Sequence, residues 1–171
     1  MLTTEEKAAI DSELSHYQQK QGGCIDALRL VQESRGWISD ETVVDIAAYL
    51  EMAPAQLENV ATFYNLIFRK PVGRHVILLC DSISCWICGY EQLKEAIADR
   101  LGITFGETTP DGCFTLLPIP CLGACDHAPT MMIDGRLYRD LDTARVAEVL
   151  EEIRSTDKNH GTATDKEHQP R

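Results

Sequence analysis

Apolar residues in positions 1–70 recur every three or four residues, which is the period of helices that bury one face. Thr3 and Glu6 have the spacing of a capping box and predict the start of a first helix. Pro54, which is favourable in a first helical turn, predicts the start of a fourth. The predicted buried faces are, in order, Ile10, Leu14 and Tyr17; Cys24, Ala27, Leu28 and Val31; Val43, Ile46, Ala47 and Leu50; and Leu57, Val60, Ala61 and Tyr64. Residues 1–70 are therefore expected to form a helical bundle.

The pattern changes near Pro71 to one that alternates strands with helices. Residues 75–80 and 114–119 are apolar runs typical of covered strands, and a helical period follows the first of them over residues 90–101. Asp134-Gly135 is a hairpin signal between short strands at 130–133 and 136–138, and Asp142 caps a last helix. The order β-α-β-β-β-α predicts an α/β fold over residues 71–154: a thioredoxin-like mixed sheet with helices on both faces.

Residues 155–171 are polar and lack apolar periodicity, so we expect this tail to be disordered. Across all 171 residues, 27 acidic side chains outnumber 16 basic ones, and the net charge is −11. Such a chain repels phosphate backbones and anionic lipid surfaces, so a nucleic-acid partner or direct membrane insertion is not expected. The N-terminus also lacks a signal-peptide pattern, and we expect a cytoplasmic protein.

Five of the seven cysteines fall into two tight groups, each after a predicted strand. Cys80, Cys85 and Cys88 form the first group, and Cys121 and Cys125 form the second. Loops that follow parallel strands gather at one edge of a sheet, so the two groups are expected to converge there. Several thiolates in one pocket need a multivalent cation, for which Zn²⁺ and an iron–sulfur cluster are the candidates.

The spacing within each group favours a cluster over zinc. Structural zinc sites usually take cysteines two residues apart, whereas Cys80 and Cys85 are separated by four residues and Cys121 and Cys125 by three. Gly123 allows the backbone to approach, so that N–H groups can point at sulfurs. We therefore favour these four cysteines as the ligands of one [2Fe–2S] cluster.

Two alternatives use Cys88. The run Cys80-x₄-Cys85-x₂-Cys88 has the spacing of plant-type ferredoxins, but it leaves one of Cys121 and Cys125 without a role. The run Cys85-Trp86-Ile87-Cys88 is a C-x-x-C motif that opens a predicted helix, as in thioredoxin-type dithiol oxidoreductases. That second interpretation leaves the other three cysteines unexplained.

Other residues near these groups have simpler interpretations. Cys88 is expected to be a small apolar residue facing into a helix, and Cys24 and Cys113 are expected to be core residues. His127 lacks the second histidine that a Rieske-type centre needs, so we expect it to be exposed. Pro129, placed just before a predicted strand as in thioredoxin-like folds, is expected to follow a cis peptide bond.

Six segments resemble the E subunit of bacterial NADH:quinone oxidoreductases, the thioredoxin-like [2Fe–2S] ferredoxin component of respiratory complex I. They are R-G-W-I-S (35–39), V-A-T-F-Y (60–64), V-G-R-H-V (72–76), C-D-S-I-S-C (80–85), F-T-L-L-P (114–118) and C-L-G-A-C-D (121–126). The resemblance runs over roughly residues 5–154 and covers both regions. It implies that the family's four ligands fall on Cys80, Cys85, Cys121 and Cys125, in agreement with the spacing.

The resemblance also implies a one-electron carrier that works beside other components of a complex. The implied partners are the FMN- and NADH-binding subunit and the large iron–sulfur subunit of complex I, at the cytoplasmic face of the inner membrane. The sequence has no G-x-G-x-x-G or P-loop motif, so we expect the chain itself to lack an NADH site. A similar subunit of a soluble NAD-linked hydrogenase or formate dehydrogenase is the alternative assembly.

Overall fold

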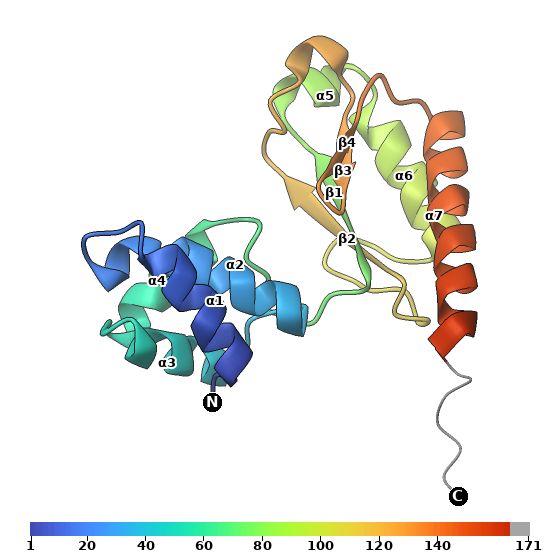
Figure 1. Ribbon diagram of the computed structural model, residues 1–171. Coiled ribbons are helices and arrows are strands. Elements are labelled where there is room, and N and C mark those ends of the chain that lie inside the picture. The colour runs from blue at the N-terminus through green and yellow to red at the C-terminus, as the bar shows by residue number, and fades with distance from the viewer. Residues whose placement is uncertain (165–171) are drawn as a thin grey trace, which may run out of the picture. The chain divides into compact units, whose positions relative to one another are not determined.

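A computed structural model of the protein describes residues 1–164, including the side chains of residues 1–157. The chain divides into two compact units, Met1–Val72 and Gly73–Arg171, which Figure 1 shows in blue to cyan and in green to red. Seven α-helices, two short 3₁₀-helices and four strands make up the described part. None of the helices in this part is long and apolar enough to cross a bilayer.

The first unit is built from the four helices that the apolar period predicts. They are α1 (Thr4–Leu14), α2 (Cys24–Arg35), α3 (Asp40–Tyr49) and α4 (Pro54–Phe63), and a 3₁₀-helix η1 (Lys20–Gly23) precedes α2. Their core is fully buried and includes Ile10, Leu28, Val31, Ile38, Ile46, Leu50 and Leu57. The four predicted helices are therefore confirmed.

Two residues of the predicted buried faces lie elsewhere. Tyr17 is exposed because α1 ends at Leu14, and its hydroxyl donates to Asp26 Oδ2 at 2.5 Å. Tyr64 is exposed because α4 ends at Phe63, and its ring makes an edge contact with the Phe63 ring. In both cases the apolar period continues past the end of the helix.

The capping-box residue Glu6 also forms a buried ion pair that joins α1 to α2. Its carboxylate accepts from the backbone N–H of Thr3 at 2.8 Å, which confirms the predicted cap. Arg35 donates from Nε to Oε1 at 2.6 Å and from Nη2 to Oε2 at 2.7 Å, and Ser34 Oγ donates to Oε1. Glu6 is only 7% exposed, and the Arg35 hydrogen bonds lower its pKa from 4.5 to about 2.

The second unit is a four-stranded mixed sheet with strand order β2-β1-β3-β4. The strands are β1 (His75–Cys80), β2 (Phe114–Ile119), β3 (Met131–Ile133) and β4 (Arg136–Tyr138). β1 and β2 run parallel, whereas β3 is antiparallel to both β1 and β4. The helices are α5 (Ile83–Ile87), α6 (Tyr90–Leu101) and α7 (Thr143–Thr164), with a 3₁₀-helix η2 at Cys125–His127. The predicted thioredoxin-like order of elements is confirmed.

The arrangement of helices differs from the expectation of helices on both faces. Figure 1 shows α6 and α7 side by side against one face of the sheet, with α5 at its end. Ile77, Leu79, Leu116, Met131 and Ile133 of the strands share one core with Leu93, Ile97, Val146, Val149 and Leu150 of these two helices. The hairpin between β3 and β4 adds strands without a crossover, so α7 returns to the face that α6 already covers.

Helix α7 extends into the polar segment that we expected to be disordered. Residues 155–164 are helical, and residues 165–171 lie outside the described part. The polar side chain of Asp157 is held by Arg74, whose Nη2 donates to Oδ2 at 2.6 Å. This ion pair joins residues 83 positions apart in the sequence and adds no apolar residue to the helical period. The apolar pattern alone therefore predicts that the last helix ends before residue 155.

We predict that Glu6→Gln destabilises the first unit by on the order of 3 kcal/mol at neutral pH, because the difference between a pKa of 4.5 and about 2 is lost. A lowered carboxylate pKa stabilises the fold above pH 4.5 and loses that effect as the pH falls toward 2. The free energy of unfolding of this unit can be measured by urea unfolding, followed by Trp37 fluorescence in a Trp86→Phe background.

Glu5→Gln is the matched control, because Glu5 is an exposed neighbour in the same helical turn. It should change stability by less than about 0.5 kcal/mol. The prediction is wrong if the two variants unfold alike at pH 7, or if the deficit of Glu6→Gln persists undiminished near pH 2.

Candidate metal centre

The two cysteine groups leave the sheet at the same edge. β1 and β2 are parallel neighbours, and Cys80 at the end of β1 is level with Ile119 at the end of β2. The chain after β1 turns into α5, which contains Cys85, and the chain after β2 reaches Cys121 two residues later. The convergence that parallel strands predict is present in the structure.

The four thiols make two close pairs at this edge. Cys121 Sγ and Cys125 Sγ lie 3.7 Å apart, and Cys80 and Cys85 share a side-chain hydrogen bond. Between the pairs, Cys80 Sγ donates to the carbonyl of Pro120, the residue before Cys121, at 3.7 Å. The Cys121 thiol is the main cause of the raised pKa of Cys125, and the charge of Cys80 raises it further. The structure therefore brings together all four cysteines that the spacing favours.

The two pairs differ in their exposure to solvent. Cys80 and Cys85 are each only 2% exposed, whereas Cys121 and Cys125 are exposed. The buried pair lies between the end of β1 and Thr130, whose hydroxyl is 3.6 Å from Cys85 Sγ. A group held by all four thiols would have one side inside the protein and one side open to solvent or to a partner.

The environment of the buried pair separates the proton affinities of its two thiols. Burial raises the pKa of the Cys80 thiol, but hydrogen bonds from the Ser82 and Leu122 backbone and from Cys85 outweigh it, and its pKa is lowered. Burial raises the pKa of Cys85, and the neighbouring Cys80 raises it further. Cys80 is thus the thiol of this pair that ionises first.

Backbone N–H groups point at these sulfurs as expected. The Gly123 N–H donates to Cys121 Sγ at 3.3 Å, and Gly123 has the positive φ of 77° that favours glycine. Together with the hydrogen bonds to Cys80, these donors stabilise negative charge on cysteine sulfur. Gly89, with φ of 114°, separates α5 from α6.

The donor set fits a two-iron cluster better than one zinc ion. Tetrahedral Zn²⁺ bound to four thiolates requires sulfurs about 3.8 Å from one another. Among the described residues, no three of these sulfurs lie within 4.8 Å of one another, although the pair at Cys121 and Cys125 does. Two pairs, each close enough to hold one iron, are what a [2Fe–2S] cluster requires.

The remaining sequence candidates lie apart from the four thiols or differ from expectation. Cys88 is exposed because α5 ends at Ile87 and α6 begins at Tyr90, so the expectation of a cysteine facing into a helix is wrong. Cys113 is buried as expected, and Cys24 is partly buried at the start of α2. His127 is exposed as expected and pairs with Asp140 at 2.9 Å.

The structure also shows contributors to the site that the sequence analysis did not identify. Thr130 is buried beside Cys85, and its carbonyl accepts from the Cys80 backbone N–H at 3.2 Å. The peptide bond between Ala128 and Pro129, immediately before Thr130, is cis as predicted. A polar residue between that proline and the apolar strand Met131–Ile133 is the signal that could have identified Thr130.

Comparisons with known proteins agree with this chemistry. The family model for thioredoxin-like [2Fe–2S] ferredoxins matches residues 10–154. The E subunit of NADH-quinone oxidoreductase from Pseudomonas aeruginosa is 45% identical over 88% of this chain and 91% of its own length. The subunit of the same name from Escherichia coli strain K12 is 46% identical over 88% of this chain and 90% of its own.

A solved structure carries the same fold inside a longer chain. The air-oxidised NAD⁺-reducing [NiFe]-hydrogenase matches with a TM-score of 0.67 and 25% identity over 78% of this chain. The present chain spans only 23% of that hydrogenase chain. The fold described above therefore occurs in that hydrogenase as one part of a larger polypeptide.

We predict that Gly123→Ala accelerates iron loss from the reconstituted protein, because a residue with a Cβ disfavours the φ of 77° that aims its N–H at Cys121. The rate of iron release to a chelator, followed at the visible absorption of the protein, measures the effect.

Gly102→Ala is the matched control, since Gly102 has φ of 69° at the end of α6 and, like Gly123, no atom within 4 Å of an added Cβ. Both substitutions should cost about 1 kcal/mol of stability through backbone strain. Equal rates of iron release in the two variants would show that the N–H at Gly123 does not support the site.

Proposed function

Because the chain belongs to the thioredoxin-like [2Fe–2S] ferredoxin family, we propose that it is the one-electron carrier subunit beside the NADH-oxidising subunit of an NADH:quinone oxidoreductase. The observation that carries the proposal is the convergence of four thiols, in two close pairs, at the edge where β1 and β2 end. The similarity to the two NADH-quinone oxidoreductase relatives over 88% of the chain supports the same assignment.

In this proposal Cys80, Cys85, Cys121 and Cys125 hold the cluster. When bound, a [2Fe–2S] cluster accepts and returns a single electron. The chain's own residues govern how favourable the added charge is. N–H groups directed at the Cys80 and Cys121 sulfurs stabilise it, while burial of Cys80 and Cys85 opposes it. The exposed Cys121 and Cys125 leave one side of the site accessible for electron transfer.

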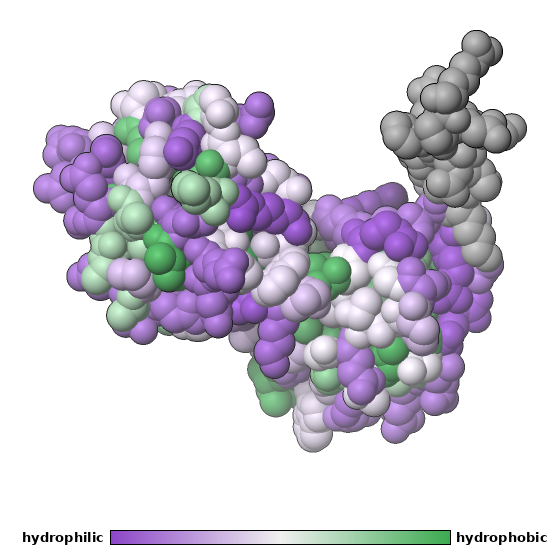
Figure 2. Space-filling model, turned by 90° about the horizontal axis from the view of Figure 1, so that it is seen from below, coloured by the Kyte–Doolittle hydropathy of each residue, from purple (hydrophilic) through white to green (hydrophobic). Residues whose placement is uncertain are grey.

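The exposed surface of α5 is a suitable docking face beside this site. Ile83, Trp86 and Ile87 are 66%, 57% and 71% exposed, and their spacing places them on one side of the helix that contains Cys85. Large apolar side chains that cluster at a surface mark interaction sites. By contrast, the face of the second unit seen in Figure 2, at the end of the sheet remote from α5, mixes polar side chains with scattered apolar ones.

We propose that the partner on this face is the FMN- and NADH-binding subunit, with the large iron–sulfur subunit of the complex as a further neighbour. The names of the relatives support an assembly that oxidises NADH and reduces quinone. The sequence resemblance supports a position on the cytoplasmic face of the inner membrane, held there through the complex. An NAD⁺-reducing hydrogenase assembly is the second candidate, favoured less because the identity is 25% rather than 45%.

The first experiment is the absorption and EPR spectrum of the anaerobically purified chain. We expect a red-brown protein with about two irons and two sulfides and a spin-half signal after reduction. Cys121→Ser should abolish the signal, whereas Cys88→Ser should retain it, because Cys88 is exposed and lies outside the four thiols.

A colourless protein with reactive thiols would overturn the proposal in favour of a dithiol oxidoreductase that uses Cys85 and Cys88. That class makes a different prediction, since Cys85→Ser and Cys88→Ser would then abolish activity equally. Retention of the EPR signal in Cys121→Ser would overturn the ligand assignment alone.

We also predict that Ile87→Asp slows electron transfer to the flavin-bearing subunit at least tenfold, because it places a charge in an apolar docking face. The absorption spectrum should be unchanged, since the side chain is 71% exposed and is not one of the four thiols.

Val44→Asp is the control, because Val44 is an apolar residue of α3 that is 51% exposed and belongs to the other unit. Stopped-flow mixing of each oxidised variant with the reduced partner measures the rate. The docking face is wrong if both variants react at the wild-type rate.

A further inference from the structure

A second cluster of metal-ligating side chains lies at the other end of β1 from Cys80. His75 is the first residue of β1, Cys113 directly precedes β2, and Asp157 lies in α7. The pairing of His75 with Phe114 places Cys113 next to the start of β1. One donor atom of each residue lies within 4.8 Å of the other two. Among the described side chains, this is the group of three donors close enough to bind one metal ion.

The hydrogen bonding of His75 leaves one ring nitrogen available as a ligand. Nδ1 lies 2.6 Å from Asp134 Oδ2, and because a carboxylate only accepts, Nδ1 carries the proton. Nε2 is buried, has no hydrogen-bond partner among the described residues and lies 3.7 Å from Asp157 Oδ1. A histidine whose one nitrogen donates to a carboxylate while the other faces further donors is the usual arrangement of a metal-binding histidine.

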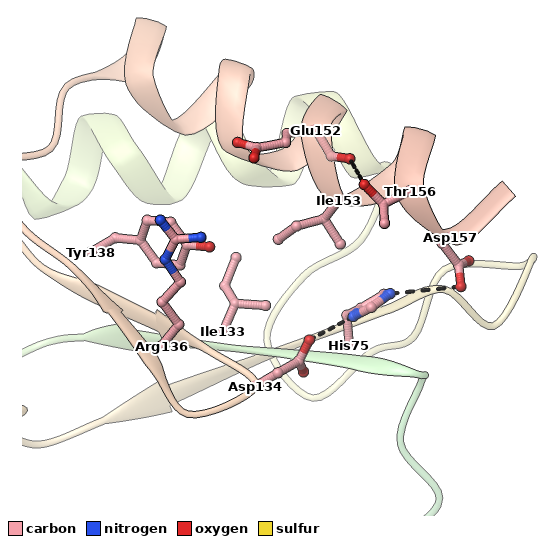
Figure 3. A pocket seen from close by; sticks show the side chains of 9 residues that line it. All are labelled: His75, Ile133, Asp134, Arg136, Tyr138, Glu152, Ile153, Thr156 and Asp157. Atoms are coloured by element: carbon pink, nitrogen blue, oxygen red, sulfur yellow. Dashed lines mark hydrogen bonds and ion pairs between the residues drawn. The ribbon is translucent and has the colours of Figure 1, made fainter. Parts of the chain in front are cut away.

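Figure 3 shows the His75 ring between the two carboxylates, at one end of a cavity. Asp134 is held in place from β1, since its Oδ1 accepts from the Val76 N–H at 3.1 Å. The imidazole is therefore oriented by contacts that do not involve Asp157 or Cys113. This orientation exists before any ion binds.

The other two donors complete a mixed nitrogen, oxygen and sulfur set. Cys113 is 1% exposed, and its Sγ lies 3.5 Å from Asp157 Oδ2. Tetrahedral zinc bound to nitrogen, oxygen and sulfur requires separations of about 3.4 to 3.6 Å between donors. Cys113 Sγ lies 3.5 Å from Asp157 Oδ2 and His75 Nε2 lies 3.7 Å from Asp157 Oδ1, so each carboxylate oxygen is near one of the other two donors.

The charges around the site suit a dication. Arg74 hydrogen bonds lower the pKa of Asp157 to about 2, so the carboxylate is ionised at neutral pH. Burial and the Asp157 carboxylate raise the pKa of Cys113, so its thiol is protonated until an ion displaces the proton. A carboxylate and a thiolate together neutralise the charge of a divalent ion. Around them, Arg74 pairs with Asp157 and Asp134 pairs with His75.

A fourth ligand position is available on the side of the cavity. The cavity has a volume of about 510 Å³ and is lined by His75, Ile133, Asp134, Tyr138, Ile153 and Asp157. Figure 3 shows that its apolar residues, Ile133 and Ile153, lie between the sheet and α7, beside His75. Water can reach an ion at His75 from this space.

We propose that His75 Nε2, Cys113 Sγ and Asp157 form a second metal site, which binds one Zn²⁺-class ion independently of the four-cysteine centre. The mixed donor set favours zinc over calcium or magnesium, which prefer oxygen ligands. The ion would join the start of β1, the residue before β2 and the polar part of α7. Its effect is to stabilise the second unit at the end remote from Cys80.

The test is equilibrium dialysis of the iron-loaded protein against Zn²⁺, with zinc and iron measured in the same sample. We expect one zinc per chain in addition to the two irons of the cluster, and a higher thermal unfolding temperature with zinc. His75→Gln and Cys113→Ala should each weaken zinc binding at least tenfold while keeping both irons. The retained irons show that these variants fold.

Cys24→Ala is the matched control, because Cys24 is a partly buried free cysteine of the first unit and should leave zinc binding unchanged. Absence of added zinc, or equal zinc in wild type and both site variants, would overturn the proposal. His75 would then serve only to link Asp134 with Asp157. This result differs from a failure of the four-cysteine proposal. In that case the wild-type protein would lack iron, but it would still bind more zinc than His75→Gln and Cys113→Ala.

Discussion

The parallel pairing of β1 with β2 is the constraint on which the rest of the second unit depends. It aligns Cys80 with Ile119, so the two loops that contain the four thiols start from one edge. A parallel pair needs a crossover, and α5 and α6 supply it while placing Cys85 against the end of β1. The same pairing sets His75 level with Phe114, which brings Cys113 to the opposite end of the sheet. One strand register thus sets the four-thiol loops at one end of the sheet and His75 with Cys113 at the other.

Much of this fold could be predicted from the sequence, because most of its elements carry a local signal. Residues 75–80, 114–119 and 136–138 are strands as the apolar runs and the hairpin signal indicate, and Thr3 caps α1 as its spacing from Glu6 indicates. The sequence predictions that were wrong have a common cause, because they concern features that depend on contacts between residues distant in the sequence. The ion pair of Arg74 with Asp157 accompanies helical structure beyond the last apolar turn of α7. The placement of α6 and α7 on one face likewise depends on strand order, which no local period encodes.

Some features of the candidate site could likewise be predicted from the sequence, and others could not. Cysteine spacing and the positions of strand ends were enough to bring Cys80, Cys85, Cys121 and Cys125 together, and a positive φ at Gly123 could be expected from its residue type. The exposure of Cys88 could not be expected, because it results from a break between α5 and α6 at Gly89. The contact of Thr130 with Cys85 spans 45 residues and has no counterpart in the pattern of the chain. The difference in burial between the two cysteine pairs is also visible only in three dimensions.

That difference in burial has a consequence for how the mature protein is made. Cys80 and Cys85 are closed off from solvent, so iron and sulfide must enter past Cys121 and Cys125. The helix that contains Cys85, α5, also carries the exposed apolar residues of the proposed docking face. The proposed docking face and the proposed ligands thus share one side of the molecule, and the two proposals together imply that the chain is loaded with its cluster before it joins its complex.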